Sequence, residues 1–349
     1  RANAAVRSER DDPVSPRNQT EASRRSLSVP RSARNVSSPE KRWSRWVDTI
    51  SAGGVSRPSL VASGIGPVYP SKAGVDYPPK GATHMLERSL ADGILTLRLA
   101  RGRANALDLD LLEALRAELN AVVARRPTAA DPAGARPAAD QPTAVVLTGA
   151  GAIFSAGVDL LRLSAGGPDY IRRFFPLLAD VLYRLFTIQV PVVAALNGHA
   201  VAGGCLLAFA CDYRLMADGG HRIGLPELSV GLPFPAVGHE IVRFAVPGHR
   251  VQSLVYTGTT LLPGEALAAG FLDEVISLES LEARAREVAA QFGAIQPEVF
   301  GHTKRFLRSE AVDRLARRGR AADAEAIMLW LSEGTQERVR SYLARVLGK

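Results

Sequence analysis

Cysteine is nearly absent from this chain, which has two among 349 residues. So few cysteines exclude a disulfide scaffold and any cysteine-rich zinc module. With 46% hydrophobic and 22% charged residues, the composition also excludes a coiled coil, collagen and a chain that is disordered throughout. What remains is an ordinary globular protein with enough apolar residues for a large core.

Uninterrupted hydrophobic runs of membrane-spanning length are missing as well. Residues 190–211 contain no charged side chain, and a run of that length could in principle cross a bilayer. Pro191, Gly198, Gly203 and Gly204 interrupt it, however, so a strand, a turn and a buried helix explain the run better. We therefore expect no membrane span.

An excess of positive charge is missing from most of the chain, although the formal net charge is +8. Residues 1–84 hold fourteen Lys or Arg against seven Asp or Glu, whereas the other 265 residues hold twenty-nine against twenty-eight. A basic face that attracts nucleic acid is therefore not predicted for the larger part, and we expect no nucleic-acid partner.

The first 84 residues have the composition of a disordered basic tail. They hold nine of the 22 prolines and no sustained period, so they bury too little apolar surface to offset the entropy of ordering. A nucleic-acid- or membrane-binding arm, an organelle transit peptide and a segment outside the working protein are the open interpretations. Glu9, Asp11 and Asp12 disfavour the transit peptide, and the first methionine, Met85, favours the last interpretation. We expect a cytoplasmic protein, with organelle targeting by the tail left open.

Regular patterning begins at Met85 and predicts strands that alternate with helices. The expected strands, the first two joined by an Asp92-Gly93 turn, are 86–90, 94–99, 144–148 and 190–196. The expected helices, the first capped by Asp108, are 108–123, about 169–187 and one from about 203, with a proline-rich loop at 126–142. This alternation is typical of an α/β fold with a largely parallel sheet. We divide the chain into the tail 1–84, an α/β core 85–262 and an all-helical C-terminal region 263–349.

The sequence offers no site for a common cofactor or metal. Gly149-Ala150-Gly151 follows a strand, but Phe154 stands where a dinucleotide-binding motif requires its third glycine. Cys205 and Cys211 have no metal-binding partners around them, so we expect small core residues and no metal.

Two segments of small residues follow predicted strands. Residues 154–160 are Phe-Ser-Ala-Gly-Val-Asp-Leu, and residues 197–205 are Asn-Gly-His-Ala-Val-Ala-Gly-Gly-Cys. Ligands of open α/β sheets gather at the carboxyl ends of strands, where glycines let backbone N–H groups approach them closely. Either segment alone could serve only tight packing, but two N–H groups that converge from two strand ends would form an oxyanion hole.

A single carboxylate stands in a third segment. Glu227 is the one charged residue between Ile223 and Gly238. Apolar surroundings raise the pKa of a carboxyl group toward neutrality, which suits a general base. An ordinary surface or helix-capping glutamate is the alternative.

Together these segments resemble the crotonase superfamily, the enoyl-CoA hydratases and isomerases. The resemblance extends from about Leu86 to Leu347 and includes further runs in the family's order, at 103–107, 191–198, 211–214, 257–258 and 270–275. It implies a crotonase-like spiral of ββα repeats with a helical C-terminal region that forms trimers. It also implies an acyl-CoA thioester substrate from fatty acid metabolism, no cofactor beyond the coenzyme A of that substrate, and a homotrimer or hexamer.

The resemblance also implies roles for individual residues. The N–H groups of Val158 and Gly203 would donate to the oxyanion, and Glu227 would be the catalytic residue. The coenzyme A part of the substrate would lie along Arg103, Ala104, Ala156, Gly157, Asp159 and Leu160.

One departure from the family's pattern bears on the reaction. Hydratases of the family carry a second glutamate three residues beyond the oxyanion glycine, where this chain has Leu206. The chain is therefore most similar to the single-glutamate Δ3,Δ2-enoyl-CoA isomerase branch, which shifts a double bond through a thioester enolate. Hydration (a lyase reaction), decarboxylation or thioester hydrolysis, with Glu227 or Glu240 as the acid/base, remains an alternative. So does a non-catalytic CoA-binding or scaffold protein.

The remaining polar residues have mostly structural interpretations. Asp212 and His199 are expected to bind backbone groups. His239 and Glu240 could face the acyl pocket, and a basic contact to the phosphates of coenzyme A would have to come from arginines or Lys304.

Overall fold

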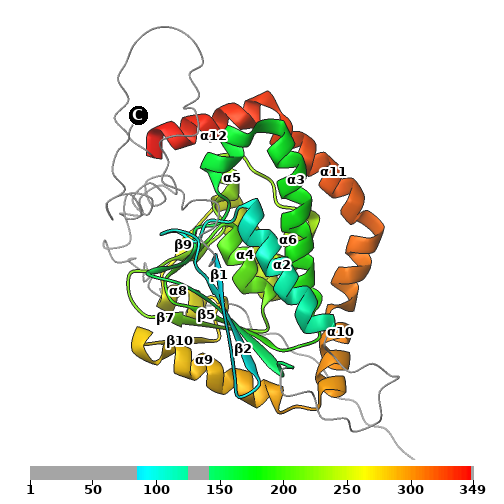
Figure 1. Cartoon of the computed structure of the whole chain (residues 1–349). Helices are drawn as coiled ribbons and strands as arrows, with labels where there is room; N and C mark the ends of the chain where they lie inside the picture. The colour runs from blue at the N-terminus through cyan, green and yellow to red at the C-terminus, as the bar shows by residue number, and fades with distance from the viewer. Residues whose placement is uncertain (1–84, 125–140, 347–349) are drawn as a thin grey trace, which may run out of the picture. The chain divides into compact units, whose positions relative to one another are not determined.

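A computed structural model describes residues 85–124 and 141–346 (Figure 1). The tail 1–84 and nearly all of the predicted loop 126–142 lie outside these described residues. Within the described ranges, no helix combines the length and the apolar character that a membrane crossing requires.

The strands form two sheets. The larger sheet has the strand order β1 (Leu86–Ala91), β2 (Ile94–Leu99), β3 (Ala144–Gly149), β5 (Val192–Leu196), β7 (Tyr213–Ala217) and β10 (Glu274–Ile276). The smaller sheet has the order β4 (Ile153–Ser155), β6 (His199–Val201), β8 (Ile223–Gly224) and β9 (Thr260–Leu261). Pairing is antiparallel between β1 and β2 and between β8 and β9, and it is parallel elsewhere.

The chain visits the two sheets in turn. A strand of the larger sheet is followed by one of the smaller sheet in the pairs β3 and β4, β5 and β6, and β7 and β8, and then by a helix. Because each pair adds next to the previous one in both sheets, the ββα units wind into the expected spiral. The carboxyl ends of β4 and β6 therefore lie side by side, and their loops carry the first two predicted segments.

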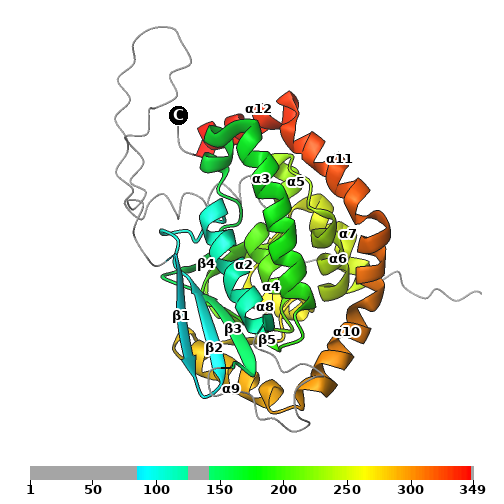
Figure 2. The same cartoon turned by 45° about the vertical axis from the view of Figure 1, so that its right-hand side comes forward.

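Helices cover both faces of the larger sheet (Figures 1 and 2). The helices of the described chain are α2 (Leu109–Ala124), α3 (Leu160–Thr187), α4 (Gly203–Ala210), α5 (Glu227–Val230), α6 (Ala236–Ala245), α7 (Gly248–Thr257), α8 (Pro263–Ala268), α9 (Leu278–Gly293), α10 (Pro297–Arg314), the π-helix η2 (Leu315–Gly319), α11 (Arg320–Leu331) and α12 (Glu333–Val346). Helix α9 covers one face with a small apolar cluster, while α2, α3 and α4 pack on the other face in the main core. Strands β3 and β5 are buried along their whole length because both faces are covered.

The elements predicted early in the chain are confirmed, including the hairpin of β1 and β2 and the Asp108 cap, whose Oδ1 accepts from the Leu111 N–H at 2.9 Å. The helix predicted at about 169–187 is confirmed as the longer, second part of α3. A shorter helical segment, residues 160–166, precedes it and was not predicted. Gly167, with a φ of 62°, separates the two parts.

The expectation of an all-helical C-terminal region is wrong at one strand. Residues Glu274–Ile276 form β10, which pairs in parallel with β7 and closes one edge of the larger sheet. Three residues are too few to show an alternating pattern, so only the pairing reveals the strand.

A buried ion cluster fastens the C-terminal helices to the sheet. Asp212, at the start of β7, accepts from Lys304 Nζ at 2.6 Å and from Arg308 Nη2 at 2.8 Å, both on α10. Its Oδ2 also accepts from the Val192 N–H at 2.8 Å, which confirms the predicted backbone contact. The Arg308 guanidinium lies 4.3 Å from the ring centre of Phe186 on α3. The cluster therefore joins α10, α3 and the beginnings of β5 and β7.

Removing the charge of Asp212 should destabilise the fold strongly. Asp212→Asn leaves two nearly inaccessible cations without their carboxylate, and we expect the free energy of unfolding to fall by about 3–5 kcal/mol. Asp180→Asn, which removes a partly exposed pair with Arg184 on α3, should cost less than about 1 kcal/mol. Urea denaturation measures both, and similar small losses in the two variants would contradict the assignment.

Candidate active site

The loop after β4 and the start of α4 approach one another unusually closely. Gly157 has a φ of 83°, and a Cβ atom at this position would lie 2.7 Å from the Ala202 Cβ and 2.8 Å from the Gly203 nitrogen. Any side chain would push the two segments apart, so glycine is required here for conformational and steric reasons alike. Two of the predicted segments therefore meet at Gly157 and Gly203.

The backbone around Val158 is held by Leu107, which precedes α2. The Leu107 N–H donates to the Gly157 carbonyl at 2.7 Å, and the Leu107 carbonyl accepts from the Asp159 N–H at 3.0 Å. These two bonds flank Val158 and do not use its N–H. The Leu107 side chain also reaches the other segment, since a Cβ added to Gly203 would lie 2.9 Å from its Cδ1.

The Gly203 N–H belongs to the first turn of α4. The first backbone bond of that helix runs from the Leu206 N–H to the Ala202 carbonyl, at 3.1 Å, so the Gly203 N–H has no acceptor within the helix. A Cβ added to Gly203 would lie 3.8 Å from the Val158 nitrogen. The structure thus brings together the two predicted N–H donors, and the helix N-terminus adds a favourable dipole for negative charge.

Glu227 is the first residue of α5. Its Oε2 atom is inaccessible to solvent and has no hydrogen-bond partner among the described residues. Burial raises the pKa of this carboxyl group to about 8, in the direction expected from its uncharged surroundings. Burial raises the pKa of the Cys205 thiol on α4, and the Glu227 carboxyl raises it further. Glu227 follows β8, which is the parallel neighbour of β6, the strand that leads to α4.

The residues expected along coenzyme A lie in two chain segments that a backbone hydrogen bond joins. The Ala156 N–H donates to the Ala104 carbonyl at 2.9 Å, which joins the two loops. Arg103 is exposed, and Asp159 caps α3 by accepting from the Arg162 N–H at 2.9 Å. Gly157 precedes Val158 in the loop after β4, and Leu160 is the first residue of α3.

Two other candidates are engaged elsewhere. Glu240 on α6 binds Arg243 at 3.3 Å and Arg314 at 2.8 Å, so its carboxylate is neutralised by arginines rather than available as an acid/base. Lys304 is held by Asp212 inside the fold and cannot reach a phosphate at the surface, so a basic contact to coenzyme A from the arginines stays a prediction.

The histidines and Leu206 have packing roles. His199 Nδ1 accepts from the Arg222 N–H at 3.1 Å, which confirms its expected backbone contact. His239 packs edge-on against Phe234 at 5.2 Å between ring centres. Leu206 is buried between α4 and α6, near Gly238, so no second carboxylate faces Glu227 from α4.

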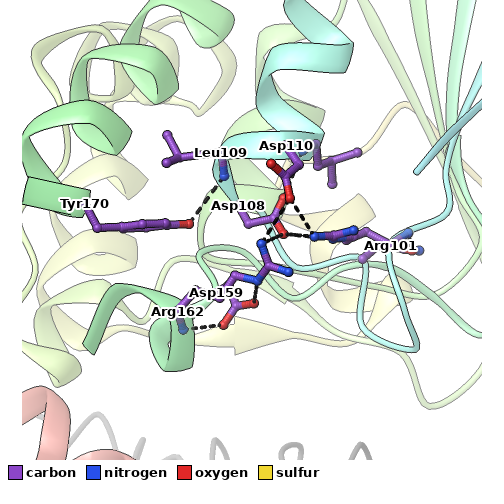
Figure 3. A network of polar contacts seen from close by, with 9 residues as sticks. Arg101, Asp108, Leu109, Asp110, Asp159, Arg162 and Tyr170 are labelled. Carbon is purple, nitrogen blue, oxygen red and sulfur yellow. Dashed lines mark hydrogen bonds and ion pairs between the residues drawn. The ribbon is translucent and has the colours of Figure 1, made fainter. Parts of the chain in front are cut away.

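Sequence reasoning missed a group of charged side chains around Asp108 (Figure 3). Asp108 was identified only as a helix cap, yet its carboxylate also binds Arg101 and Arg162. Arg162 is 54 positions away in the sequence, and nothing in the local pattern marks it as a partner. The one sequence signal for this group was the predicted N-cap position of Asp108.

Known proteins similar to this chain include enoyl-CoA isomerases and hydratases. A family model described as enoyl-CoA hydratase/isomerase matches residues 90–343. Enoyl-CoA delta isomerase 1, mitochondrial, of Mus musculus is 32% identical over 199 residues, which cover 56% of this chain and 68% of the relative. A putative enoyl-CoA hydratase of Thermus thermophilus is 39% identical over 153 residues, 42% of this chain and 60% of the relative. The crystal structure of human mitochondrial delta3-delta2-enoyl-CoA isomerase superposes with a TM-score of 0.66 at 26% identity, covering 74% of this chain and 97% of that one.

The raised pKa of Glu227 should make folding depend on pH. The folded chain keeps this proton up to about pH 8, whereas the unfolded chain loses it near the ordinary value of 4.5. The folded state binds more protons between these values, so this contribution to stability is complete below the lower pKa and is lost as the pH rises through the upper one. Urea denaturation at about pH 5 and about pH 8 should show a larger loss for wild type than for Glu227→Gln. The exposed control Glu279→Gln should behave like wild type, and an equal loss in all three proteins would rule out the buried proton.

Proposed function

The chain belongs to the enoyl-CoA hydratase/isomerase family of the crotonase superfamily, and from that premise we propose that it isomerises a 3-enoyl-CoA to a 2-enoyl-CoA. The observation that carries this proposal is the Glu227 carboxyl group, whose Oε2 is buried without a hydrogen-bond partner among the described residues, at the end of β8. Strand β8 is the parallel neighbour of β6, and β6 leads to the Gly203 N–H, which lies next to that of Val158. A single base with two N–H donors is sufficient for a proton shift.

The reaction needs one proton to leave and return. The Glu227 carboxylate takes a proton from C2 of the 3-enoyl thioester, and the electrons move onto the thioester oxygen to form an enolate. The N–H groups of Val158 and Gly203 stabilise that oxygen, each such donor being worth about 3–4 kcal/mol in comparable sites. The protonated Glu227 then returns the proton to C4, and the double bond ends between C2 and C3. A pKa near the working pH suits a group that must both accept and donate.

Hydration is disfavoured because α4 carries no carboxylate. Leu206 is buried and apolar at the position where hydratases of the family carry their second glutamate, so no second carboxylate activates a water molecule there. The similarity to a named hydratase nevertheless makes hydration the second candidate. A non-catalytic CoA-binding protein is the third.

Replacing Glu227 tests the mechanism directly. With a 3-enoyl-CoA as substrate and the absorbance of the conjugated product as the signal, Glu227→Gln should lower kcat by about 10²–10⁴ and change KM little. Glu240→Gln is the matched control, because its carboxylate is bound by two arginines, and it should retain kcat.

The alternatives give different results in the same assay. Undiminished turnover by Glu227→Gln, or loss of turnover only in Glu240→Gln, would contradict the assigned base. Hydration of a 2-enoyl-CoA by wild type at a rate comparable to isomerisation would favour the hydratase. Binding of the thioester without either reaction would favour the non-catalytic protein.

We also propose that the C-terminal region mediates self-association. Helices α10 and α11 expose several large apolar side chains: Val299, Phe306, Leu307, Met328 and Leu329 are 52–72% exposed. Large exposed apolar side chains on consecutive helices are typical of an interface between copies. The trimer or hexamer and the cytoplasmic location expected from the sequence stay predictions.

A charge placed in this surface should weaken the assembly. Phe306 is 72% exposed on α10, so Phe306→Asp should leave the monomer folded but lower the mass measured by light scattering from three or six chains toward one. Leu278→Asp, at a 51% exposed apolar residue on α9, is the control and should keep the wild-type mass. An unchanged mass for Phe306→Asp would exclude this part of α10 from the interface.

A further inference from the structure

Asp108 is an inaccessible carboxylate with two arginine partners. None of its surface is exposed, and its Oδ2 lies 2.6 Å from Arg101 Nη2 and 3.0 Å from Arg162 Nη1. Its Oδ1 accepts from the Leu111 N–H and caps α2. Figure 3 shows the two arginines approaching this carboxylate from separate parts of the chain.

The two arginines come from the loops that border the proposed site. Arg101 lies in the turn after β2, two residues before Arg103. Its N–H donates to Asn105 Oδ1, and its carbonyl accepts from the Asn105 N–H, both at 3.0 Å. Arg162 lies in the first turn of α3, four residues after Val158. Asp108 therefore connects the loop expected along coenzyme A with the loop that carries one oxyanion donor.

Asp108 is also adjacent to the residue that holds this donor in place. Leu107 makes the two backbone bonds that flank Val158, and its side chain packs against Gly203. Any shift of Asp108 moves Leu107, and a shift of Leu107 changes the separation of the two N–H groups. A displacement of about 1 Å in such a site can cost about 10²-fold in rate.

Capping alone does not account for the charge. A neutral asparagine caps a helix about as well as an aspartate, and a buried ion pair often adds little net stability because both charges lose their hydration. The negative charge is needed only because two arginines converge on it. Asp110 binds the same arginines at 3.0 and 3.1 Å, but it is 52% exposed and lies outside the packed interior.

We propose that Asp108, Arg101 and Arg162 form a positioning unit that sets the distance between the Val158 and Gly203 N–H groups and so tunes the oxyanion hole. This proposal rests on the proposed isomerase function. The unit does not touch the substrate; it acts through Leu107 and the first turn of α3.

Asp108→Asn separates the charge from the cap, because asparagine keeps the shape and the Oδ1 acceptor. We expect kcat for a 3-enoyl-CoA to fall by about 10- to 100-fold while KM changes little. A second measurement uses acetoacetyl-CoA, a 3-ketoacyl thioester that forms an enolate, and free coenzyme A. The variant should bind acetoacetyl-CoA at least about tenfold more weakly and coenzyme A as tightly as wild type.

Arg162→Gln provides a milder variant that leaves Asp108 with Arg101, in case Asp108→Asn fails to fold. It should lower kcat and acetoacetyl-CoA binding in the same direction, by about threefold or more, without weakening coenzyme A binding. Asp110→Asn is the matched control, since it removes an exposed carboxylate from the same arginines, and it should match wild type.

Each failure has its own signature. If wild type neither isomerises nor prefers acetoacetyl-CoA over coenzyme A, the proposed function fails, and the positioning unit fails with it. If wild type does both and Asp108→Asn or Arg162→Gln equals it, only the positioning unit is overturned. Equal weakening of both ligands in these variants also overturns it, because that result indicates a general collapse of the binding loops.

Discussion

The close approach of Gly157 to Gly203 is the constraint on which the rest of the site depends. A Cβ atom at Gly157 would lie 2.8 Å from the Gly203 nitrogen, so the loop after β4 and the start of α4 can meet only because no side chain separates them. The spiral of ββα units provides this meeting, since β4 and β6 are parallel neighbours whose carboxyl ends lie at the same edge. Leu107 then holds Val158 through two backbone bonds, and both donors lie against the same residue. A larger residue at Gly157 would push the two donors apart.

Glu227 differs from the other inaccessible acids of the described chain in its charged partners. Asp108, Asp212 and Glu240 are each nearly inaccessible, and each is bound by two cations. Glu227 has neither a lysine nor an arginine partner among the described residues, and its Oε2 makes no hydrogen bond. The protonated form is therefore favoured, which explains why its pKa rises to about 8 while the other acids serve as charged anchors. A buried acid without a cation is costly for folding, and such a cost is typical of a functional group.

Much of the fold could be predicted because its signals are local. The hairpin of β1 and β2, the cap of α2 and the buried strands β3 and β5 follow from alternation, turn residues and short apolar runs within a few positions of one another. The short helical segment 160–166 and strand β10 could not be predicted in this way. Gly167 breaks the helical backbone between that segment and the predicted helix, and the three residues of β10 are defined only by their pairing with β7.

By itself the sequence determined which residues are able to form the site. Gly157 and Gly203 follow strands, and Glu227 stands in an uncharged stretch, so a close backbone approach and a raised pKa were both predictable from neighbours along the chain. Only the tertiary structure decided which charged side chains are bound by opposite charges and so cannot act on a substrate. Lys304 is bound by Asp212, Glu240 by Arg314, and Asp108 by Arg101 and Arg162. Most of these contacts join residues that lie far apart in the chain, and their formation depends on the order in which the strands assemble, which no local pattern encodes.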